Sequence, residues 1–269
     1  MKTAELDYFL PPEQIAQRSV EPRDHSKLLV ADRVSGEMEH LQFYDIVKFL
    51  RPDDILVFNN TKVFRARLRV GAIEILLLRP ANDAWLAEYQ TVYARHTGSV
   101  AAPTAGFHFT KELREKIQSL GVTFLEVTLH VGIGTFQPVK TELVEAHPMH
   151  SEWVNVDAET AGAIAAAKKA GRRVIAVGTT TTRALEGAAA EILAGKSFEG
   201  DVNIFINPGY KFKIIDGLVT NFHLPKSTLL LLVSAFLGDD GLDRLKKIYA
   251  DAITRKYRFF SFGDGMFIN

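Results

Sequence analysis

Four short clusters of polar residues in this chain carry side chains that could take part in chemistry. They occupy residues 102–110, 129–138, 178–183 and 221–228, and three of them contain a histidine. Histidine is the side chain best suited to exchange a proton near neutral pH. Hydroxyls, backbone N–H groups at a helix start and arginine can hold a carboxylate or a phosphate. These residue types could hold an anionic group, and each cluster also has an ordinary structural explanation.

The first cluster is a loop shaped by proline and glycine. Thr104, Gly106 and His108 stand ahead of a predicted helix, whose N-terminal N–H groups favour anions. An ordinary turn with a solvated histidine would give the same pattern.

The second cluster follows a predicted strand over residues 122–131. His130 ends the strand, and Gly132, Gly134 and Thr135 come next, so that a ligand could approach the backbone. A hairpin or a bulge explains the two glycines equally well. The pattern is not a dinucleotide-binding fingerprint, because no third glycine follows at the right offset. Nearby His147, His150 and Glu152 are ligand types, but their spacing fits no standard zinc motif, and we predict no metal site.

The third and fourth clusters each lead into a predicted helix. Thr179, Thr180 and the two following threonines form a loop after a predicted strand, with Arg183 able to clamp an anion. A helix N-cap with spare hydroxyls is the alternative. Residues 221–228 hold Asn221, His223, Lys226 and Ser227 before a buried helix, and we expect function there.

The C-terminal stretch combines six basic residues between 244 and 258 with four aromatic residues between 257 and 262. Such a mixture suits a surface for loop or single-stranded RNA. A solvated helix face with aromatic core anchors is the alternative.

Alternating helix and strand patterns must position these clusters. We predict strands at 28–30, 55–58, 73–78, 122–131 and 174–177. Helices are predicted after Thr110, from Asp157 to Gly171, from the threonine loop to about Leu193, over 227–237 and over 242–257. A helix–strand–loop–helix order indicates an α/β layer.

Composition limits the function classes. The chain has 269 residues, no cysteine, and 32 basic against 32 acidic side chains, so a globally basic nucleic-acid binder is not supported. The N-terminus is too polar for a signal peptide, and the apolar run near 229–237 is too short for a membrane span. We therefore expect a soluble, cytoplasmic protein.

The clusters together resemble one enzyme family. The matching segments, in order, are LDYFLPPEQIAQ (6–17), EPRDHSKLLV (21–30), NNTKV (59–63), YQTVYA (89–94), AAPTAGFHFT (101–110), HVGIGTF (130–136), GTTTTR (178–183), NFHLPKST (221–228) and YRFFSFGD (257–264). They are similar to those of the S-adenosylmethionine:tRNA ribosyltransferase-isomerases of queuosine biosynthesis. They run from end to end of the chain and keep their order.

The resemblance implies that the ribosyl part of S-adenosylmethionine is transferred to 7-aminomethyl-7-deazaguanine at the tRNA wobble position and isomerised to give epoxyqueuosine, with release of adenine and methionine. It implies S-adenosylmethionine and this tRNA as partners, no cofactor or metal, and no obligate protein partner. Because the sulfonium acidifies the neighbouring 5′ carbon, a base could start the rearrangement, and the candidates are His130, His223 and His108. The expected substrate-binding residues are Thr104, Gly106, Gly132, Gly134, Thr135, His150, Glu152, Thr179, Thr180, Arg183, Asn221, Lys226 and Ser227. The expected tRNA-binding residues are Lys226, Arg255 and Arg258.

One departure from the family concerns domain organisation. Members carry a longer insertion between the strand ending near Arg79 and the motif at Tyr89, where this chain has only a short bridge. We expect an α/β main domain over 1–72 and 89–269, with a mixed, partly barrel-like sheet and flanking helices, and a remnant of a smaller β-rich domain at 73–88. Either the short form is natural or residues are missing from the chain.

Two other functions compete: a tRNA-binding module that lost activity with this segment, and a methyltransferase on another substrate.

Overall fold

The computed structural model describes residues 1–64, 69–70, 73–74, 88–132, 141–148 and 150–269. Its centre is a nine-stranded mixed sheet, accompanied by two small sheets of two strands each. The strands are β1 (Lys27–Ala31), β2 (Met38–Gln42), β3 (Ile55–Asn59), β4 (Thr61–Val63), β5 (Arg69–Val70), β6 (Ile73–Glu74), β7 (His96–Ser99), β8 (Thr123–Leu129), β9 (Glu152–Val156), β10 (Val174–Val177), β11 (Phe198–Val202), β12 (Gly217–Asn221) and β13 (Gly265–Ile268).

Four neighbouring strands of the large sheet run in one direction, and this direction decides where the polar clusters meet. The strand order is β11-β9-β8-β3-β10-β12-β13-β1-β2, with β8, β3, β10 and β12 parallel. β9 is antiparallel to β8, β13 is antiparallel to β12, and β1 is parallel to β13. The four parallel strands therefore finish at the same end of the sheet at which β9, β13 and β1 begin. We call it the carboxyl end.

The predicted α/β class with a mixed sheet and flanking helices is confirmed. The partly barrel-like character stays a prediction, because the strand order runs from β11 to β2 and no pairing joins these two strands in the described ranges.

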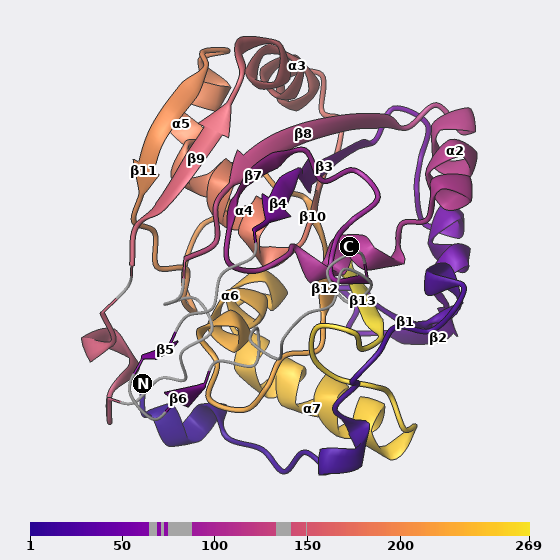
Figure 1. The fold of residues 1–269 in the computed structure, drawn as a ribbon, viewed down its shortest axis with the longest axis vertical. Helices are drawn as coiled ribbons and strands as arrows, with labels where there is room; N and C mark the ends of the chain where they lie inside the picture. The colour runs from indigo at the N-terminus through magenta and orange to yellow at the C-terminus, as the bar shows by residue number, and fades with distance from the viewer. Residues whose placement is uncertain (65–68, 71–72, 75–87, 133–140, 149) are drawn as a thin grey trace.

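Helices cover both faces of the sheet. The α-helices are α2 (Lys111–Ser119), α3 (Ala158–Lys169), α4 (Thr179–Gly187), α5 (Ala189–Leu193), α6 (Thr228–Leu237) and α7 (Gly241–Thr254). The 3₁₀ turns are η1 (Thr3–Leu6), η2 (Pro12–Gln14), η3 (Arg23–His25), η4 (Phe43–Lys48), η6 (Thr104–His108) and η8 (Val144–Ala146). Figure 1 shows α3 and α5 beside β9 and β11 at one end of the molecule, and α6 and α7 at the other.

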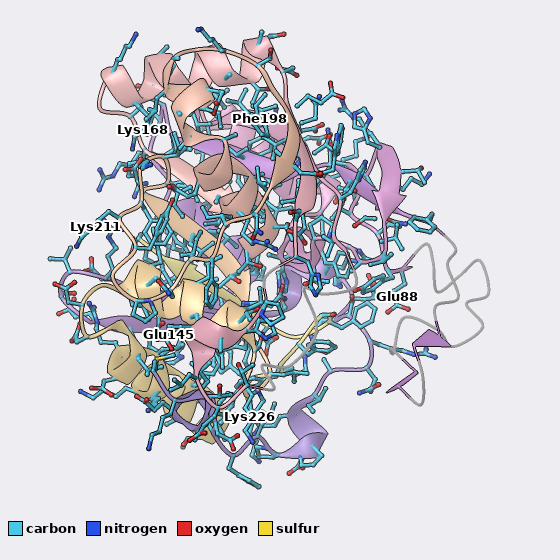
Figure 2. The ribbon with its side chains drawn as sticks, turned by 90° about the vertical axis from the view of Figure 1, so that its left-hand side faces the viewer. Glu88, Glu145, Lys168, Phe198, Lys211 and Lys226 are labelled. Carbon is cyan, nitrogen blue, oxygen red and sulfur yellow. The ribbon has the colours of Figure 1, made fainter. Side chains whose placement is uncertain are left out.

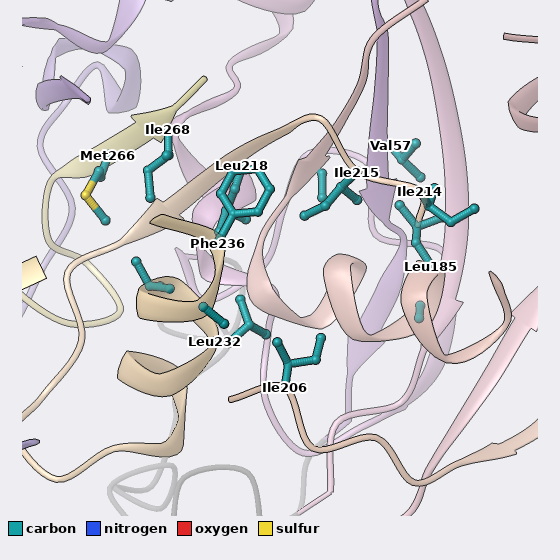
Figure 3. Packing of buried hydrophobic residues seen from close by; sticks show 14 of the residues in the cluster. Val57, Leu185, Ile206, Ile214, Ile215, Leu218, Leu232, Phe236, Met266 and Ile268 are labelled. Carbon is teal, nitrogen blue, oxygen red and sulfur yellow. The ribbon is translucent and has the colours of Figure 1, made fainter. Parts of the chain in front are cut away.

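Two hydrophobic clusters lie on the two faces, because side chains alternate along each strand. The larger cluster joins β3, β10, β12 and β13 to helices α3 to α7, and the smaller one joins the opposite strand faces to η4 and α2. In Figure 3, Leu232 and Phe236 of α6 pack below Leu218 and Met266 of the sheet. Removing such apolar surface from water is the main stabilising contribution to this fold.

Local capping explains where several helices begin and end. Thr110 accepts a hydrogen bond from the Leu113 N–H at 3.2 Å, and Asp157 accepts one from the Thr160 N–H at 2.7 Å, so that the predicted N-caps of α2 and α3 are confirmed. Gly121 and Gly171 follow these helices with φ of +89° and +68°, a conformation that glycine adopts without strain. Leu120, the C-cap residue of α2, is 40% exposed.

Two predictions for this layer need correction. The expected threonine loop is the start of α4 itself, and the expected single helix to Leu193 is broken at Ala188 into α4 and α5. Of the predicted strand 73–78, the structure describes only β6, and the remainder lies outside the described residues. The proposed domain junction at 73–88 falls mostly on the same residues and stays a prediction.

Among the described helices, none combines the length and apolar character needed to cross a membrane.

Candidate functional site

Polar residues gather at the carboxyl end of the sheet because each parallel strand is followed by one of them. β3 ends at Asn59, β8 leads to His130, β10 leads to Thr179 through Gly178, and β12 ends at Asn221. Three of the four sequence clusters are thus brought to one end of one sheet, where ligands of open α/β sheets bind. The first cluster reaches the same end through contacts of its own.

His108 joins the first cluster to the fourth through hydrogen bonds. Its Nε2 lies 3.3 Å from the Asn221 amide nitrogen, and its Nδ1 lies 2.8 Å from the Ser26 hydroxyl. The Thr104 hydroxyl donates to the Asn221 amide oxygen at 2.9 Å. Because the amide nitrogen can only donate, Nε2 accepts and the ring proton sits on Nδ1.

The His108 imidazole is kept neutral by its surroundings. It is 4% exposed and stacks on Phe43 with ring centroids 4.5 Å apart. Burial is the main cause that lowers the pKa of His108 to about 3, and the positive charge of Arg258 lowers it further. This histidine is therefore a hydrogen-bonding group at neutral pH rather than an efficient base.

His130 has a different environment. Its Nδ1 lies 2.8 Å from the Thr61 hydroxyl, and its ring stacks on Trp153 at 5.0 Å with a 15° interplanar angle. The side chain is half-buried, and burial, followed by the neighbouring His96, lowers the pKa of His130 below its ordinary value. Gly132 beyond it is half-buried, whereas Gly134 and Thr135 lie outside the described residues.

Asn59 ties the second and third clusters together. Its amide nitrogen donates to the Leu129 carbonyl at 3.0 Å and to the Thr180 hydroxyl at 3.3 Å. Its amide oxygen accepts from the N–H groups of Leu129 and Thr61 at 3.0 and 3.1 Å. One fully buried side chain thus fixes the spacing of β3, β8 and α4.

The four threonines at 179–182 fall into two pairs with different roles. Thr181 and Thr182 donate their hydroxyls back to the carbonyls of Val177 and Gly178, which is a local role within α4. Thr179 and Thr180 occupy the first turn of the helix, where unpaired N–H groups attract anions. Gly178 makes the sharp entry with φ of +97°.

Arg183, one turn further along α4, forms a buried ion pair. Its guanidinium contacts the carboxylate of Glu152, and the two side chains are 5% and 1% exposed. The Arg183 Nε is buried without a hydrogen-bond partner in the described structure. Arg183 also lines a small cavity of about 20 Å³ with His150, Leu229 and Leu232. The arrangement places a charged group at the wall of a narrow space that His147 and Thr228 also line.

His223 lies two residues beyond the end of β12 and has partners other than those of Asn221. Its Nε2 is 3.0 Å from the Thr220 hydroxyl, and its backbone N–H donates to the Tyr249 hydroxyl at 3.0 Å. The Tyr8 hydroxyl donates to the His223 carbonyl. Burial lowers the pKa of His223 to about 3, so that this ring is also neutral. No hydrogen bond within the described ranges links it to His108 or His130.

The basic candidates are placed separately from these histidines. Lys226 forms an ion pair with Asp7 at 2.9 Å, both about half exposed, and Figure 2 shows it at the opposite end of the molecule from Lys168. Arg255 pairs with Asp251 on the surface of α7. Arg258 donates to the carbonyls of Arg18 and Phe262, which is a structural use of its side chain. Ser227 caps α6 by accepting from the Leu229 N–H.

Three of the four aromatic residues of the C-terminal stretch follow the core-anchor alternative, whereas Phe260 is half-buried. Tyr257, Phe259 and Phe262 are 1%, 0% and 8% exposed, so they are core anchors and offer no stacking surface. In the part of the chain that the structure describes, no three histidine, aspartate or glutamate side chains converge as a metal site.

Sequence reasoning did not assign four residues that organise this end of the sheet: Ser26, Asn59, Thr61 and Thr220. The first three stand in segments that carried the family resemblance, 21–30 and 59–63. Their motif membership was the one signal that could have found them. Their roles depend on contacts across 35 to 121 residues of sequence, which no local pattern reports.

Comparisons with known proteins agree with one another. The family model described as queuosine biosynthesis protein matches residues 3–88 and 78–268. The S-adenosylmethionine:tRNA ribosyltransferase-isomerase of Halothermothrix orenii is 44% identical over 343 aligned positions, and that of Thermotoga maritima is 43% identical over 338, each alignment covering the whole of both chains. The crystal structure of the S-adenosylmethionine tRNA ribosyltransferase from Thermotoga maritima superimposes with a TM-score of 0.73 at 38% identity, covering 98% of this chain and 100% of the other.

Proposed function

Because this chain belongs to the queuosine biosynthesis protein family, we propose that it is an S-adenosylmethionine:tRNA ribosyltransferase-isomerase. It would transfer the ribosyl part of S-adenosylmethionine to 7-aminomethyl-7-deazaguanine at the wobble position of tRNA and isomerise it to give epoxyqueuosine, with release of adenine and methionine. The observation that carries the proposal is full-length similarity at 43–44% identity to relatives with that name. S-adenosylmethionine enters as a substrate, no cofactor takes part, and the tRNA acceptor favours a cytoplasmic location.

His130 is the residue we assign as the base that removes a proton from the 5′ carbon beside the sulfonium. An efficient base has a pKa near the working pH. His108 and His223, whose pKa values are both lowered to about 3, are too weak for this role. His130 is half-buried at the carboxyl end of the sheet, and its Nε2 has no hydrogen-bond partner among the described residues. His108, Asn221 and Thr104 then supply fixed hydrogen-bonding groups for substrate hydroxyls.

Arg183 is the residue we assign to the carboxylate of the methionine part. Arg183 lines the small cavity beside Leu229 and Leu232, whose aliphatic side chains suit the methylene groups of methionine, and its buried Nε has no hydrogen-bond partner in the described structure. Glu152 holds the guanidinium in place through the buried ion pair. A charge-assisted hydrogen bond to a carboxylate is among the stronger contacts that this wall can make.

Lys226 and Arg255 are the basic residues we assign to tRNA phosphates. Their side chains are 47% and 54% exposed, whereas Arg258 is committed to backbone carbonyls. With a formal net charge of zero, the chain must meet the polyanion through such local groups.

The chain has fewer residues than the alignments with its relatives have positions. Against 343 aligned positions it has 269 residues, so at least 74 positions of the Halothermothrix alignment face no residue of this chain. The two family-model matches meet and overlap at 78–88. This overlap supports a shortened segment between Arg79 and Tyr89, with 1–72 and 89–269 as the main domain.

The test is incubation with S-adenosylmethionine and tRNA that carries 7-aminomethyl-7-deazaguanine, followed by mass spectrometry of the nucleosides and of free adenine. We expect epoxyqueuosine and an equal amount of adenine, with a His130→Asn variant as the matched control. If tRNA binds and no adenine is released under conditions in which a longer relative turns over, the chain is a binding module. Methylated RNA together with S-adenosylhomocysteine would indicate a methyltransferase.

A further inference from the structure

The orientation of His130 is set by residues outside the proposed catalytic and binding set. Thr61 opens β4 directly after β3 and is fully buried. Its hydroxyl oxygen lies 2.8 Å from His130 Nδ1 and 3.4 Å from the carbonyl oxygen of His96. Its backbone N–H donates to the Asn59 amide oxygen at 3.1 Å, which holds the residue in place.

The chemistry of these partners assigns the proton on the ring. A threonine hydroxyl has one proton to donate, and a carbonyl oxygen can only accept. With the Thr61 hydroxyl directed at the His96 carbonyl oxygen, at 3.4 Å, its oxygen is able to accept from His130, which favours the imidazole proton on Nδ1. The lone pair of the neutral ring is then on Nε2.

The plane of the ring is fixed by contacts with its faces. Trp153 stacks on the ring at a 15° interplanar angle. A Cβ built on Gly98 of β7 would lie 2.5 to 2.7 Å from Nε2, Cε1 and Cδ2 of His130. Because these three distances are nearly equal, the added Cβ would lie over the face of the imidazole ring rather than beyond its edge. Gly98 therefore gives the imidazole room to lie flat, and the Nε2 lone pair points along the ring plane.

We infer that Thr61 is a positioning residue for His130, which it holds in the Nδ1–H tautomer so that Nε2 can accept the substrate proton. The inference rests on the proposed function. In the step concerned, the C–H bond at the 5′ carbon beside the sulfonium breaks and an N–H bond forms at Nε2. The electron pair stays on carbon, and no oxidant or reductant is needed.

The experiment uses the full chain and three substitutions. Thr61→Val keeps the shape and removes the hydroxyl, Thr61→Ser restores the hydroxyl, and Thr128→Val removes a buried hydroxyl of the neighbouring strand as a matched structural control. We expect Thr61→Val to lower kcat by about 10-fold or more with KM for S-adenosylmethionine within about 2-fold, because the ring then populates the wrong tautomer. Thr61→Ser should recover most of kcat, and Thr128→Val should leave it near wild type.

A second readout does not depend on turnover. Nitrogen-15 NMR of the histidine rings distinguishes a proton on Nδ1 from one on Nε2, and the wild-type His130 signal should report Nδ1–H. Thr61→Val should shift it towards the Nε2–H form.

The outcomes separate this inference from the proposed function. If His130→Asn abolishes adenine release while Thr61→Val turns over like Thr128→Val, the role of Thr61 is overturned and the function stands. An Nε2–H signal in the wild-type protein would also overturn it. Full activity of His130→Asn would remove the base assignment and this inference together.

Discussion

Acidification should destabilise this protein through two buried histidines, His108 and His223. Both have a folded-state pKa of about 3, against an ordinary value of 6.5. The unfolded chain therefore binds a proton at each ring near pH 6.5, whereas the folded chain does not bind one until the pH is close to 3. Their contribution to stability is complete above about pH 6.5 and is lost progressively as the pH falls from there towards about 3.

The magnitude follows from these two values. Between about pH 7 and about pH 5, uptake of one proton by the unfolded state alone costs about 2 kcal/mol for each histidine, or about 4 kcal/mol for the pair. His130, whose pKa is also lowered, adds a loss of the same sign. Carboxylates with ordinary pKa values near 4 contribute little in this window, whereas burial raises the pKa of Asp264, whose contribution has the opposite sign.

Urea unfolding at a series of pH values measures the loss. The wild-type protein should lose about 4 kcal/mol or more between about pH 7 and about pH 5, and His108→Asn should lose about 2 kcal/mol less over the same range. His25→Asn, outside the buried histidine set, serves as the control and should keep the wild-type slope. A wild-type loss below about 1 kcal/mol, or equal slopes for wild type and His108→Asn, would refute the reasoning from burial.

Two further predictions concern packing and charge. Gly106→Ala should lower the free energy of unfolding by about 1–3 kcal/mol, because the new Cβ would lie 1.8 Å from the Tyr93 hydroxyl oxygen. Gly162→Ala in α3 is the matched control, since its Cβ would meet no atom within 4 Å, and it should raise the free energy of unfolding by up to about 1 kcal/mol. Thermal or urea unfolding measures both. Arg183→Met should lower the free energy of unfolding by about 3–5 kcal/mol, because it removes the cation beside the buried Glu152 carboxylate. Adding Glu152→Gln should recover at least half of that loss. A double variant no more stable than Arg183→Met would contradict the ion-pair account.

The strands and helices that the sequence predicts correctly are those whose signals lie within a few neighbouring residues. β1, β3 and β10 are short apolar runs between turn residues, and all three form central strands of the sheet. α2 and α3 begin at the side-chain caps predicted for them, and α6 forms within the range 227–237 predicted for it. A cap and a buried run report interactions within a few residues of sequence, which is why the sequence is sufficient for them.

The parts that were missed depend on distant pairing. β13 consists of four residues near the chain end and shows no period, yet it lies between β12 and β1 in the sheet. The start of α4 was predicted as a loop because threonine is a weak helix former. There, the hydroxyls of Thr181 and Thr182 bond back to carbonyls, and burial against the sheet outweighs propensity.

The candidate site shows the same division. The histidines were identified from their type and their surroundings in sequence, but their chemical state was not, because it depends on which group donates to which nitrogen. The Nε2 of His108 is occupied by the Asn221 amide, whereas among the described residues the Nε2 of His130 has no such partner, and we infer a ring proton on Nδ1 in both. Sequence spacing left the three histidines equal as candidate bases, and contacts across the fold separate them.

The residues that follow the segment we propose to be shortened contact β4, the strand that carries Thr61. The Gln90 side chain donates to the Val63 carbonyl at 3.0 Å and accepts from the Val63 N–H at 3.2 Å, as a neighbouring strand would. Arg23 in turn donates to the Gln90 carbonyl at 2.9 Å. β4 is therefore held on one side by β7 and on the other by a side chain that follows the junction. Since Thr61 opens β4, a chain that rejoins at Gln90 keeps the contacts that orient its proposed base, whatever the length of the segment before it.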